Sequence, residues 1–313
     1  MACIRRRRVA RIGSPLAVAA LAAAIALAAC GGSGTATATS QPGTGATGHR
    51  PASLAHNPSS GTVTGKATGT PGTTPVPILM YHVIAPPPPG APFPGLYVPA
   101  DEFAAQMRAL KAAGWHAVTL DQVQAFWKQG VPLGPGKPIV ISFDNGYRSQ
   151  YANALPVLQR MGWVGDENIQ LTGLPPSQGG LSDAQVHGLI DAGWELDTQG
   201  ISHADLITLD STQLGYQVAT ARQILRRRYG VPVNWFCYPS GHYDATVIAE
   251  VKAAGFVGST TVVPGWAGPA NDPYRLPRLR VLGGTSPQAL LDQIASAQSA
   301  SAPPASYGGA GTA

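Results

Sequence analysis

Side chains that can transfer protons or bind a cation are concentrated in four short segments, each of which follows an apolar, strand-like run. The segments are Tyr81-His82, Asp144-Asn145, Asp197 to His203 and Pro239 to His242. Asp144 precedes a glycine turn, where an aspartate is either a reactive group or the N-cap of the following helix. His203, four residues after Gln199, is either a metal ligand or a loop-capping histidine. His82 ends a predicted strand, so it is either a reactive histidine or a core histidine held by hydrogen bonds. His242 lies either on a loop surface or along a cleft.

Strand-like and helix-like segments alternate along most of the chain. The strand candidates are residues 76–82, 116–120, 138–143, 167–171, 194–199, 233–238, 256–261 and 279–282. The amphipathic helix candidates are residues 101–113, 121–129, 149–161, 182–192, 211–229, 243–254 and 287–295. Such alternation predicts a parallel sheet covered by helices, either a barrel or a doubly wound sheet. Seven or eight units in about 220 residues favour a distorted (β/α) barrel with about seven parallel strands. In either arrangement chemistry is expected at the carboxyl ends of the strands, where the four polar segments lie.

Several of these segments carry motifs of one protein family. Val140-Ile-Ser-Phe-Asp-Asn-Gly146 resembles the Thr-Phe-Asp-Asp-Gly signature of the polysaccharide deacetylase (NodB-homology) family. Residues 193–206 are similar to its His-Ser/Thr-x-x-His segment, and Phe236-Cys-Tyr-Pro-Ser-Gly-His-Tyr-Asp244 is similar to its Tyr-Pro-x-Gly-x-Tyr-Asp motif. Pro77-Ile-Leu-Met-Tyr-His82 and Tyr274-Arg-Leu-Pro-Arg278 resemble circularly permuted members, in which a Tyr-His strand begins the domain. The likeness runs from about residue 76 to residue 295 and implies the barrel fold of that family.

The resemblance implies metal-assisted hydrolysis of an N-acetyl or O-acetyl group on a sugar. In that family a divalent ion, usually zinc, polarises the acetyl carbonyl and lowers the pKa of a bound water. The general base of the family falls on Asp144, and the general acid of the permuted members falls on His82. The backbone amide that helps to hold the oxyanion falls on Ser240.

The metal-ligand positions depart from the family pattern. They fall on Asn145, Gln199 and His203, so that amides replace a carboxylate and an imidazole. An amide oxygen is neutral and a poorer zinc ligand, which predicts an ion that is weakly held or absent. Asp197 shares a strand face with Gln199 and is a candidate substitute ligand; alternatively it pairs with an arginine or with backbone amides at a strand end. Cys237 stands where many members carry an arginine.

The first thirty residues have the pattern of a bacterial lipoprotein signal peptide. A basic stretch (Arg5 to Arg8 and Arg11) precedes an apolar run, 16–29, whose small residues end at Cys30, the expected lipidation site. The alternatives are a simple secretory signal or an uncleaved anchor helix. The five arginines equal the whole net charge of +5, so the rest of the chain is balanced and gives no indication of nucleic-acid binding. Cys237 then has no partner, and no intrachain disulfide is expected.

The sequence therefore predicts four parts: a signal peptide at 1–30, a flexible Gly/Ser/Thr/Pro tether at 31–75, a deacetylase-like domain at 76–298 and a flexible tail at 299–313. We expect a lipid-anchored protein of the cell membrane or envelope that removes acetyl groups from an N-acetylated or O-acetylated envelope or exported polysaccharide. The alternatives are a relative that binds glycan without hydrolysis and a hydrolase of another amide or ester that uses a different ion. The expected partners are a glycan and, through the lipid, a membrane, while the oligomeric state is left open.

Overall fold

The structure is a computed structural model that describes residues 66–174 and 179–309. The predicted signal peptide with Cys30 and most of the predicted tether lie outside these residues. Within the two described ranges, no helix is both long and apolar enough to cross a bilayer.

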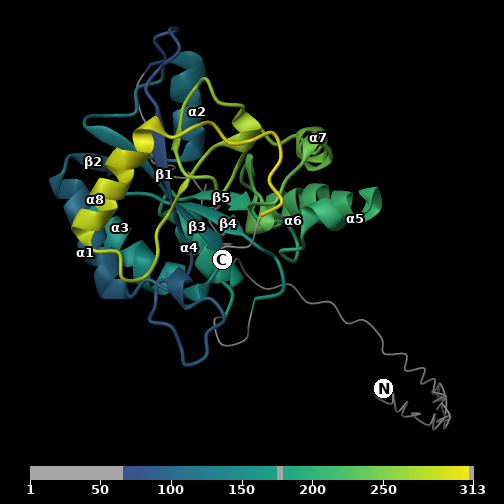
Figure 1. Cartoon of the computed structure of the whole chain (residues 1–313), viewed down its shortest axis with the longest axis horizontal. Helices are drawn as coiled ribbons and strands as arrows, with labels where there is room; N and C mark the ends of the chain where they lie inside the picture. Colours follow the sequence, from purple (N-terminus) through teal and green to yellow (C-terminus); the bar gives the residue numbers. More distant parts are fainter. Residues whose placement is uncertain (1–65, 175–178, 310–313) are drawn as a thin grey trace, which may run out of the picture. The chain divides into compact units, whose positions relative to one another are not determined.

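A curled sheet of seven parallel strands lies at the centre of the domain (Figure 1). The strand order is β7-β6-β5-β4-β3-β1, and β9 follows on the far side of β1. These strands are β1 (Val76–Tyr81), β3 (Lys137–Asn145), β4 (Asp166–Ile169), β5 (Glu195–Thr198), β6 (Trp235–Cys237), β7 (Gly258–Thr260) and β9 (Leu279–Arg280). Two short strands add to the sheet: β2 (Trp115–Ala117) runs parallel to the start of β3, and β8 (Trp266–Ala267) pairs antiparallel with the start of β1. The predicted distorted barrel of about seven parallel strands is confirmed.

Residues 276–281 connect the two edges of this sheet. The segment first bonds beside β7, where the Leu276 backbone N–H donates to the Ser259 carbonyl at 3.0 Å. It then bonds to β1, where the Val281 N–H donates to the Met80 carbonyl at 3.0 Å. Because the same segment bonds to strands at both edges, it bridges the gap between the two edges of the curled sheet. Arg278 lies in the middle of the closing segment.

The described residues form eight α-helices, which follow the strands along the chain (Figure 1). They are α1 (Ala100–Ala112), α2 (Leu120–Gln129), α3 (Leu155–Met161), α4 (Asp183–Asp191), α5 (Ser211–Gly215), α6 (Ala221–Tyr229), α7 (Ala245–Ala253) and α8 (Pro287–Ser296). A π-helical turn at Gln150–Ala154 precedes α3, and another at Tyr216–Thr220 joins α5 to α6, so the predicted helices 149–161 and 211–229 are each interrupted. The start of α2 shows how local sequence sets a boundary, because Thr119 and Gln122 form a reciprocal capping box.

The two faces of β3 have different surroundings. Ile139, Ile141 and Phe143 face outward into a hydrophobic cluster with residues of α1, α3 and α8. Phe143 stacks on Trp194 with ring centroids 4.9 Å apart. Asp144, like Ser142 two residues before it, points inward, because successive strand residues face opposite sides of a sheet. The helices therefore cover an apolar outer face, while polar side chains are buried inside the barrel.

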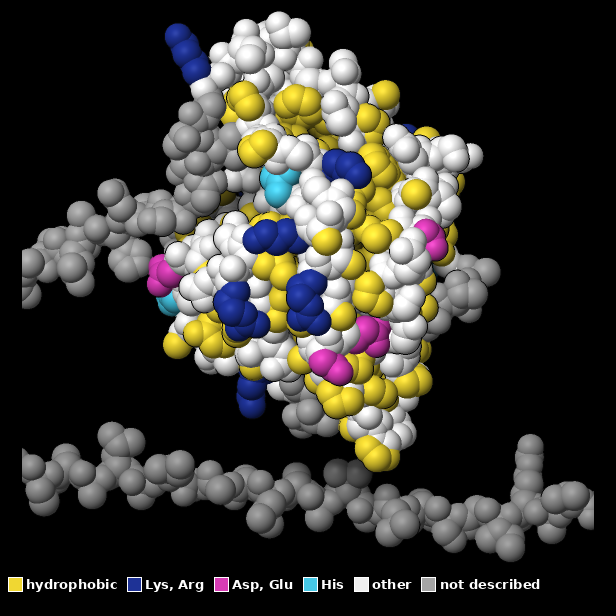
Figure 2. Space-filling view, turned by 90° about the vertical axis from the view of Figure 1, so that its left-hand side faces the viewer, with side chains coloured by type: hydrophobic (Ala, Val, Ile, Leu, Met, Phe, Trp, Pro, Cys, Tyr) yellow, Lys and Arg dark blue, Asp and Glu magenta, His cyan; other side chains and the backbone are white. Residues whose placement is uncertain are grey.

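Figure 2 shows the side of the domain that carries α1 and α8. Basic side chains, in dark blue, and acidic side chains, in magenta, both occur on this face among hydrophobic and uncharged groups. This mixture agrees with the balanced charge that the sequence has outside its N-terminal arginines.

The folded domain extends beyond the predicted limits of 76 and 298. Before β1, the Gly72 N–H donates to the Phe126 carbonyl at 2.9 Å, and the Thr74 carbonyl accepts from Trp127 Nε1 at 2.9 Å. After α8, Tyr307 exchanges two backbone hydrogen bonds of 2.8 Å with Tyr243. The parts of the predicted tether and tail that the structure describes therefore pack on the domain. They are held mainly through backbone groups, and the composition of Gly, Thr, Ala and Pro gave no apolar pattern to reveal this.

Candidate active site

A cleft of about 780 Å³ lies at the carboxyl ends of the strands. Its lining comes from the segments that follow or end β1, β3, β4, β5, β6, β7 and β9. Six of the seven residues for which the sequence predicted a catalytic or metal-binding role line this cleft: His82, Asp144, Asn145, Gln199, His203 and Ser240. The fold thus brings together residues that are more than 150 positions apart in the sequence, from His82 to Ser240.

Three of these cleft residues have an unusual backbone conformation. Asn145 (φ 79°), His203 (φ 57°) and Ser240 (φ 54°) are the non-glycine residues with positive φ in the part of the chain that the structure describes. Such conformations cost about 1–3 kcal/mol each and persist where the surrounding structure enforces them. Asn145 ends β3, whereas the other two lie in turns after β5 and β6. All three strained residues therefore lie in the cleft, as is common at functional sites.

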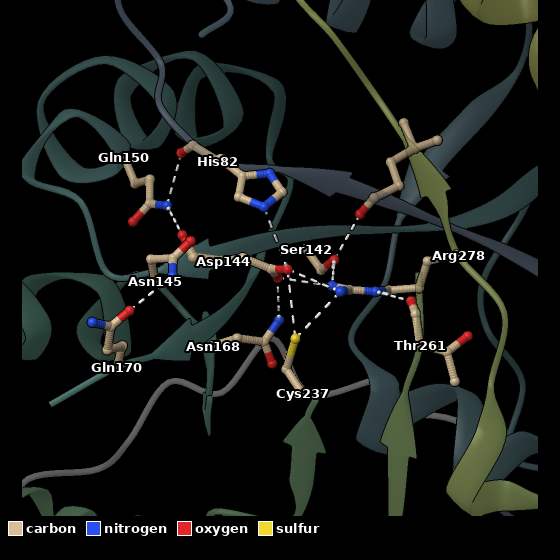
Figure 3. A network of polar contacts seen from close by, with 11 residues as sticks. His82, Ser142, Asp144, Asn145, Gln150, Asn168, Gln170, Cys237, Thr261 and Arg278 are labelled. Carbon is tan, nitrogen blue, oxygen red and sulfur yellow. Dashed lines mark hydrogen bonds and ion pairs between the residues drawn. The ribbon is translucent and has the colours of Figure 1, made fainter. Parts of the chain in front are cut away.

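Asp144 is held by a buried arginine. Arg278 donates from Nη1 to Asp144 Oδ1 at 2.8 Å and from Nη2 to Asp144 Oδ2 at 2.9 Å (Figure 3). Asn168 Nδ2 also donates to Oδ1 at 3.0 Å. Burial by itself raises the pKa of Asp144, but the charge of Arg278 and its hydrogen bonds outweigh burial and lower the pKa to about 2. Asp144 is therefore ionised at neutral pH, and with this pKa it is a weak proton acceptor.

Arg278 is the functional residue whose role the sequence did not predict. It is fully buried, and besides Asp144 it contacts Ser142 Oγ at 3.1 Å, the Thr261 carbonyl at 2.9 Å and Cys237 Sγ at 3.2 Å (Figure 3). The small Cys237 side chain, at the position where many members of the resembling family carry an arginine, thus packs against an arginine that comes from another segment. The signal in the sequence was the resemblance of Tyr274-Arg-Leu-Pro-Arg278 to the permuted family members, which singled out this segment without giving Arg278 a partner.

His82 lies against the same carboxylate. Its Nε2 is 3.9 Å from Asp144 Oδ2, and the residue is 9% exposed. Burial lowers the pKa of His82 to about 4, and the attraction of Asp144 only partly opposes this shift. His82 is therefore a neutral imidazole at neutral pH. Its Nδ1 is buried and has no hydrogen-bond partner in the described residues.

The predicted metal-binding residues Asn145, Gln199 and His203 all lie in the cleft. Asn145 Nδ2 donates to Gln170 Oε1 at 2.9 Å, whereas Gln199 Oε1 is buried without a hydrogen-bond partner in the described residues. Burial lowers the pKa of His203, which favours the neutral imidazole. The described residues contain no group of three histidine, cysteine, aspartate or glutamate side chains that could hold a metal ion. One imidazole with two neutral amides does not fit a tightly bound zinc ion, which prefers charged or imidazole ligands.

Asp197 is not part of the cleft, and the expectation that it replaces the missing carboxylate ligand is wrong. Its Oδ1 accepts the backbone N–H groups of Asn234 (3.1 Å) and Trp235 (2.8 Å) at the start of β6. Its carboxyl is fully buried, and burial together with the nearby Asp166 raises its pKa. The sequence-based alternative, a carboxylate held by backbone amides at a strand end, describes Asp197 in the structure.

Comparison with known proteins gives concordant matches. Residues 133–259 match the family model described as polysaccharide deacetylase. The chain is 27% identical over 212 residues to the Bacillus subtilis protein named "Putative polysaccharide deacetylase YxkH", covering 67% of this chain and 73% of that protein. A 58-residue stretch is 36% identical to the poly-β-1,6-N-acetyl-D-glucosamine N-deacetylase of Escherichia coli K12, which corresponds to 18% of this chain and 8% of that enzyme.

The fold is similar to that of solved deacetylase structures. The Streptococcus pyogenes deacetylase PplD in complex with acetate superposes with a TM-score of 0.64 and 25% identity, over 72% of this chain and 99% of that chain. The matched family model spans the segment from before Asp144 to beyond Ser240, which carries five of the six predicted site residues that line the cleft. Taken with the cleft geometry, these matches show that residues 133–259 are similar to polysaccharide deacetylases and that the fold of the described residues is similar to that of solved deacetylases.

Proposed function

We propose that the domain binds an N-acetylated or O-acetylated polysaccharide of the cell envelope, or one that is exported, and hydrolyses its acetyl groups. The observation that carries this proposal is the convergence of Asp144, His82, His203 and Ser240 in one cleft, in the motif order of polysaccharide deacetylases. The similarity to a deacetylase solved with acetate and to an N-acetylglucosamine polymer deacetylase supports an acetylated sugar as the substrate class.

The protein groups in the cleft have complementary chemical capacities. The neutral imidazole of His82 can take a proton from a water at one step and return it to the leaving group at the next. The fixed Asp144–Arg278 pair orients the floor of the cleft and places a carboxylate 3.9 Å from that imidazole. His82 and Gln199 line the cleft, where they add polar side chains to the wall that a bound acetamide or sugar hydroxyl would meet. Because the amide-rich donor set does not fit a tightly held ion, none of these roles depends on a metal.

A second function is favoured by a specific observation. Amides occupy two ligand positions, and Arg278 neutralises the carboxylate at the general-base position, so the cleft keeps its shape while losing catalytic power. In this alternative the domain binds a glycan without hydrolysing it.

Acetate release from chito-oligosaccharides by the full chain tests the proposal. We expect release that is lost in His82→Gln, because this substitution removes the imidazole but keeps a polar side chain of similar reach. Asp144→Asn should also lose activity, and circular dichroism would show whether this variant keeps its fold, since it leaves Arg278 buried without its ion pair. Wild-type protein that binds the oligosaccharides and releases no acetate, with or without added zinc, would establish the glycan-binding alternative.

We further propose that lipidation of Cys30 anchors the domain at the cell membrane or envelope, as the N-terminal sequence pattern suggests. In the producing bacterium, Cys30→Ala should move the protein from the membrane fraction to the soluble extracytoplasmic fraction. Retention of the variant in the membrane fraction would refute lipid anchoring through this residue.

A further inference from the structure

The C-terminal segment 303–309 forms part of the cleft wall. Tyr307 and Gly309 line the cleft together with His242, which lies in the turn after β6. This segment belongs to the part of the chain for which the sequence predicted a flexible tail. Its position adds an aromatic ring to the site that none of the family motifs supplies.

The segment is held at two points. Tyr243 and Tyr307 exchange two backbone hydrogen bonds of 2.8 Å, in the manner of an antiparallel strand pair. The Pro304 carbonyl accepts from Tyr243 Oη at 2.9 Å and from Arg275 Nη1 at 3.0 Å. Because the segment makes these contacts through the backbone groups of Pro304 and Tyr307, they do not depend on the Tyr307 ring.

His242 is oriented by its neighbours. Its Nδ1 lies 3.0 Å from Asp205 Oδ1, an arrangement that places the proton on Nδ1 and leaves Nε2 as the second ring atom for a hydrogen bond. The rings of His242 and Tyr307 lie 6.4 Å apart between centroids. Gly309 passes so close to His242 Nε2 that a Cβ on this residue would collide with it. The imidazole is thus held between Asp205 and the C-terminal segment.

We propose that Tyr307 and His242 form a second sugar-binding position, which takes the sugar next to the one that carries the acetyl group. A pyranose ring has an apolar face that packs on an aromatic ring and an edge of hydroxyl groups that bond to a fixed polar atom. The Tyr307 ring and the adjacent His242 Nε2 offer both features in one wall of the cleft. His242 and His203 line the same cleft, so the second position adjoins the candidate catalytic residues. The proposal rests on glycan binding in the proposed function but not on hydrolysis.

The test compares affinities of the full chain for the single sugar N-acetylglucosamine and for an N-acetylated chito-oligosaccharide of four sugars, measured by titration calorimetry. We expect Tyr307→Ala and His242→Ala each to weaken binding of the tetramer about five- to tenfold, and to change binding of the single sugar much less, because it does not reach the second position. Tyr307→Phe should retain most of the affinity, because it keeps the ring. Tyr216→Ala is the matched control, since Tyr216 is a 53% exposed tyrosine that does not line the cleft.

The outcomes separate this proposal from the proposed function, because acetate release is measured on the same samples. If Tyr307→Ala and His242→Ala change tetramer affinity no more than Tyr216→Ala does, the second sugar position is refuted, even if acetate is released. Loss of tetramer affinity without any acetate release would support the second position and refute hydrolysis. A wild-type chain that does not bind the tetramer would also overturn the proposal. His242→Ala does not touch the backbone contacts at Pro304 and Tyr307, so it tests the position even if Tyr307→Ala loosens the segment.

Discussion

Replacing Arg278 by leucine tests the physical description of the site most directly. Each pKa unit corresponds to about 1.4 kcal/mol, so lowering the pKa of Asp144 from its ordinary 3.8 to about 2 contributes about 2.5 kcal/mol of stability. This contribution is present above pH 4 and is lost as the pH falls from about 4 to 2. In Arg278→Leu the carboxyl stays buried without its cation, and burial then raises its pKa. We therefore expect a loss of about 3–5 kcal/mol at pH 7.5, in line with breaking one side of a buried ion pair.

The pH dependence distinguishes this effect from simple loss of packing. In the folded variant the pKa of Asp144 is raised, so ionisation of Asp144 lowers the stability of the variant as the pH rises above about 4. In the wild type, where the pKa of Asp144 is lowered, its ionisation does not reduce stability over the same range. The difference in unfolding free energy, measured by urea denaturation, should therefore grow between pH 4.5 and pH 7.5. A loss for Arg278→Leu that stays the same between pH 4.5 and pH 7.5 would contradict this description of the Asp144–Arg278 pair.

Three further predictions concern the metal positions, the buried carboxyl and the turn after β6. Dialysed wild-type protein should hold much less than one zinc per chain, and Asn145→Asp combined with Gln199→His should raise this value toward one by elemental analysis; a wild type that keeps one zinc would contradict the donor-set argument. Asp197→Asn should stabilise the fold more at pH 8 than at pH 5 in denaturant titrations, because a raised pKa makes ionisation of the buried carboxyl cost stability as the pH rises, and acetate release should not change. Gly241→Ala should lower the melting temperature more than Gly284→Ala, since both glycines have positive φ but only at Gly241 does a Cβ meet a neighbouring side chain; equal effects would contradict the close packing of this turn.

The sequence was sufficient for the barrel and for most of the cleft, because both follow from local patterns. Apolar strands alternate with amphipathic helices, and polar residues such as Asp144 and His203 come directly after the strands. In a parallel sheet the carboxyl ends of all strands lie on the same side, so the order of the motifs alone places these residues together. No long-range information was needed for this part of the site.

The remainder of the site depends on distances that local patterns do not contain. Asp197 shares a strand face with Gln199, but it lies two residues, about 6–7 Å, nearer the amino end of the strand. There it reaches the backbone at the start of β6 instead of the cleft. Arg278 is separated from Asp144 by 134 positions, so its role depends on how the barrel closes. The position of Tyr307 is set by backbone hydrogen bonds, which any residue can make.

The segment 276–281 that joins the two edges of the sheet has a consequence for how the protein folds. The same segment closes the barrel and delivers Arg278 to Asp144, so a chain whose strands have formed but whose edges are still apart has no finished cleft floor. Contacts between residues so far apart in the chain form slowly, because a long loop must be closed first. When refolding is monitored by ligand binding, it should therefore be slower than when the same refolding is monitored by far-ultraviolet circular dichroism. A ligand of the cleft would bind only chains in which segment 276–281 joins both edges of the sheet. It would therefore suppress detachment of this segment.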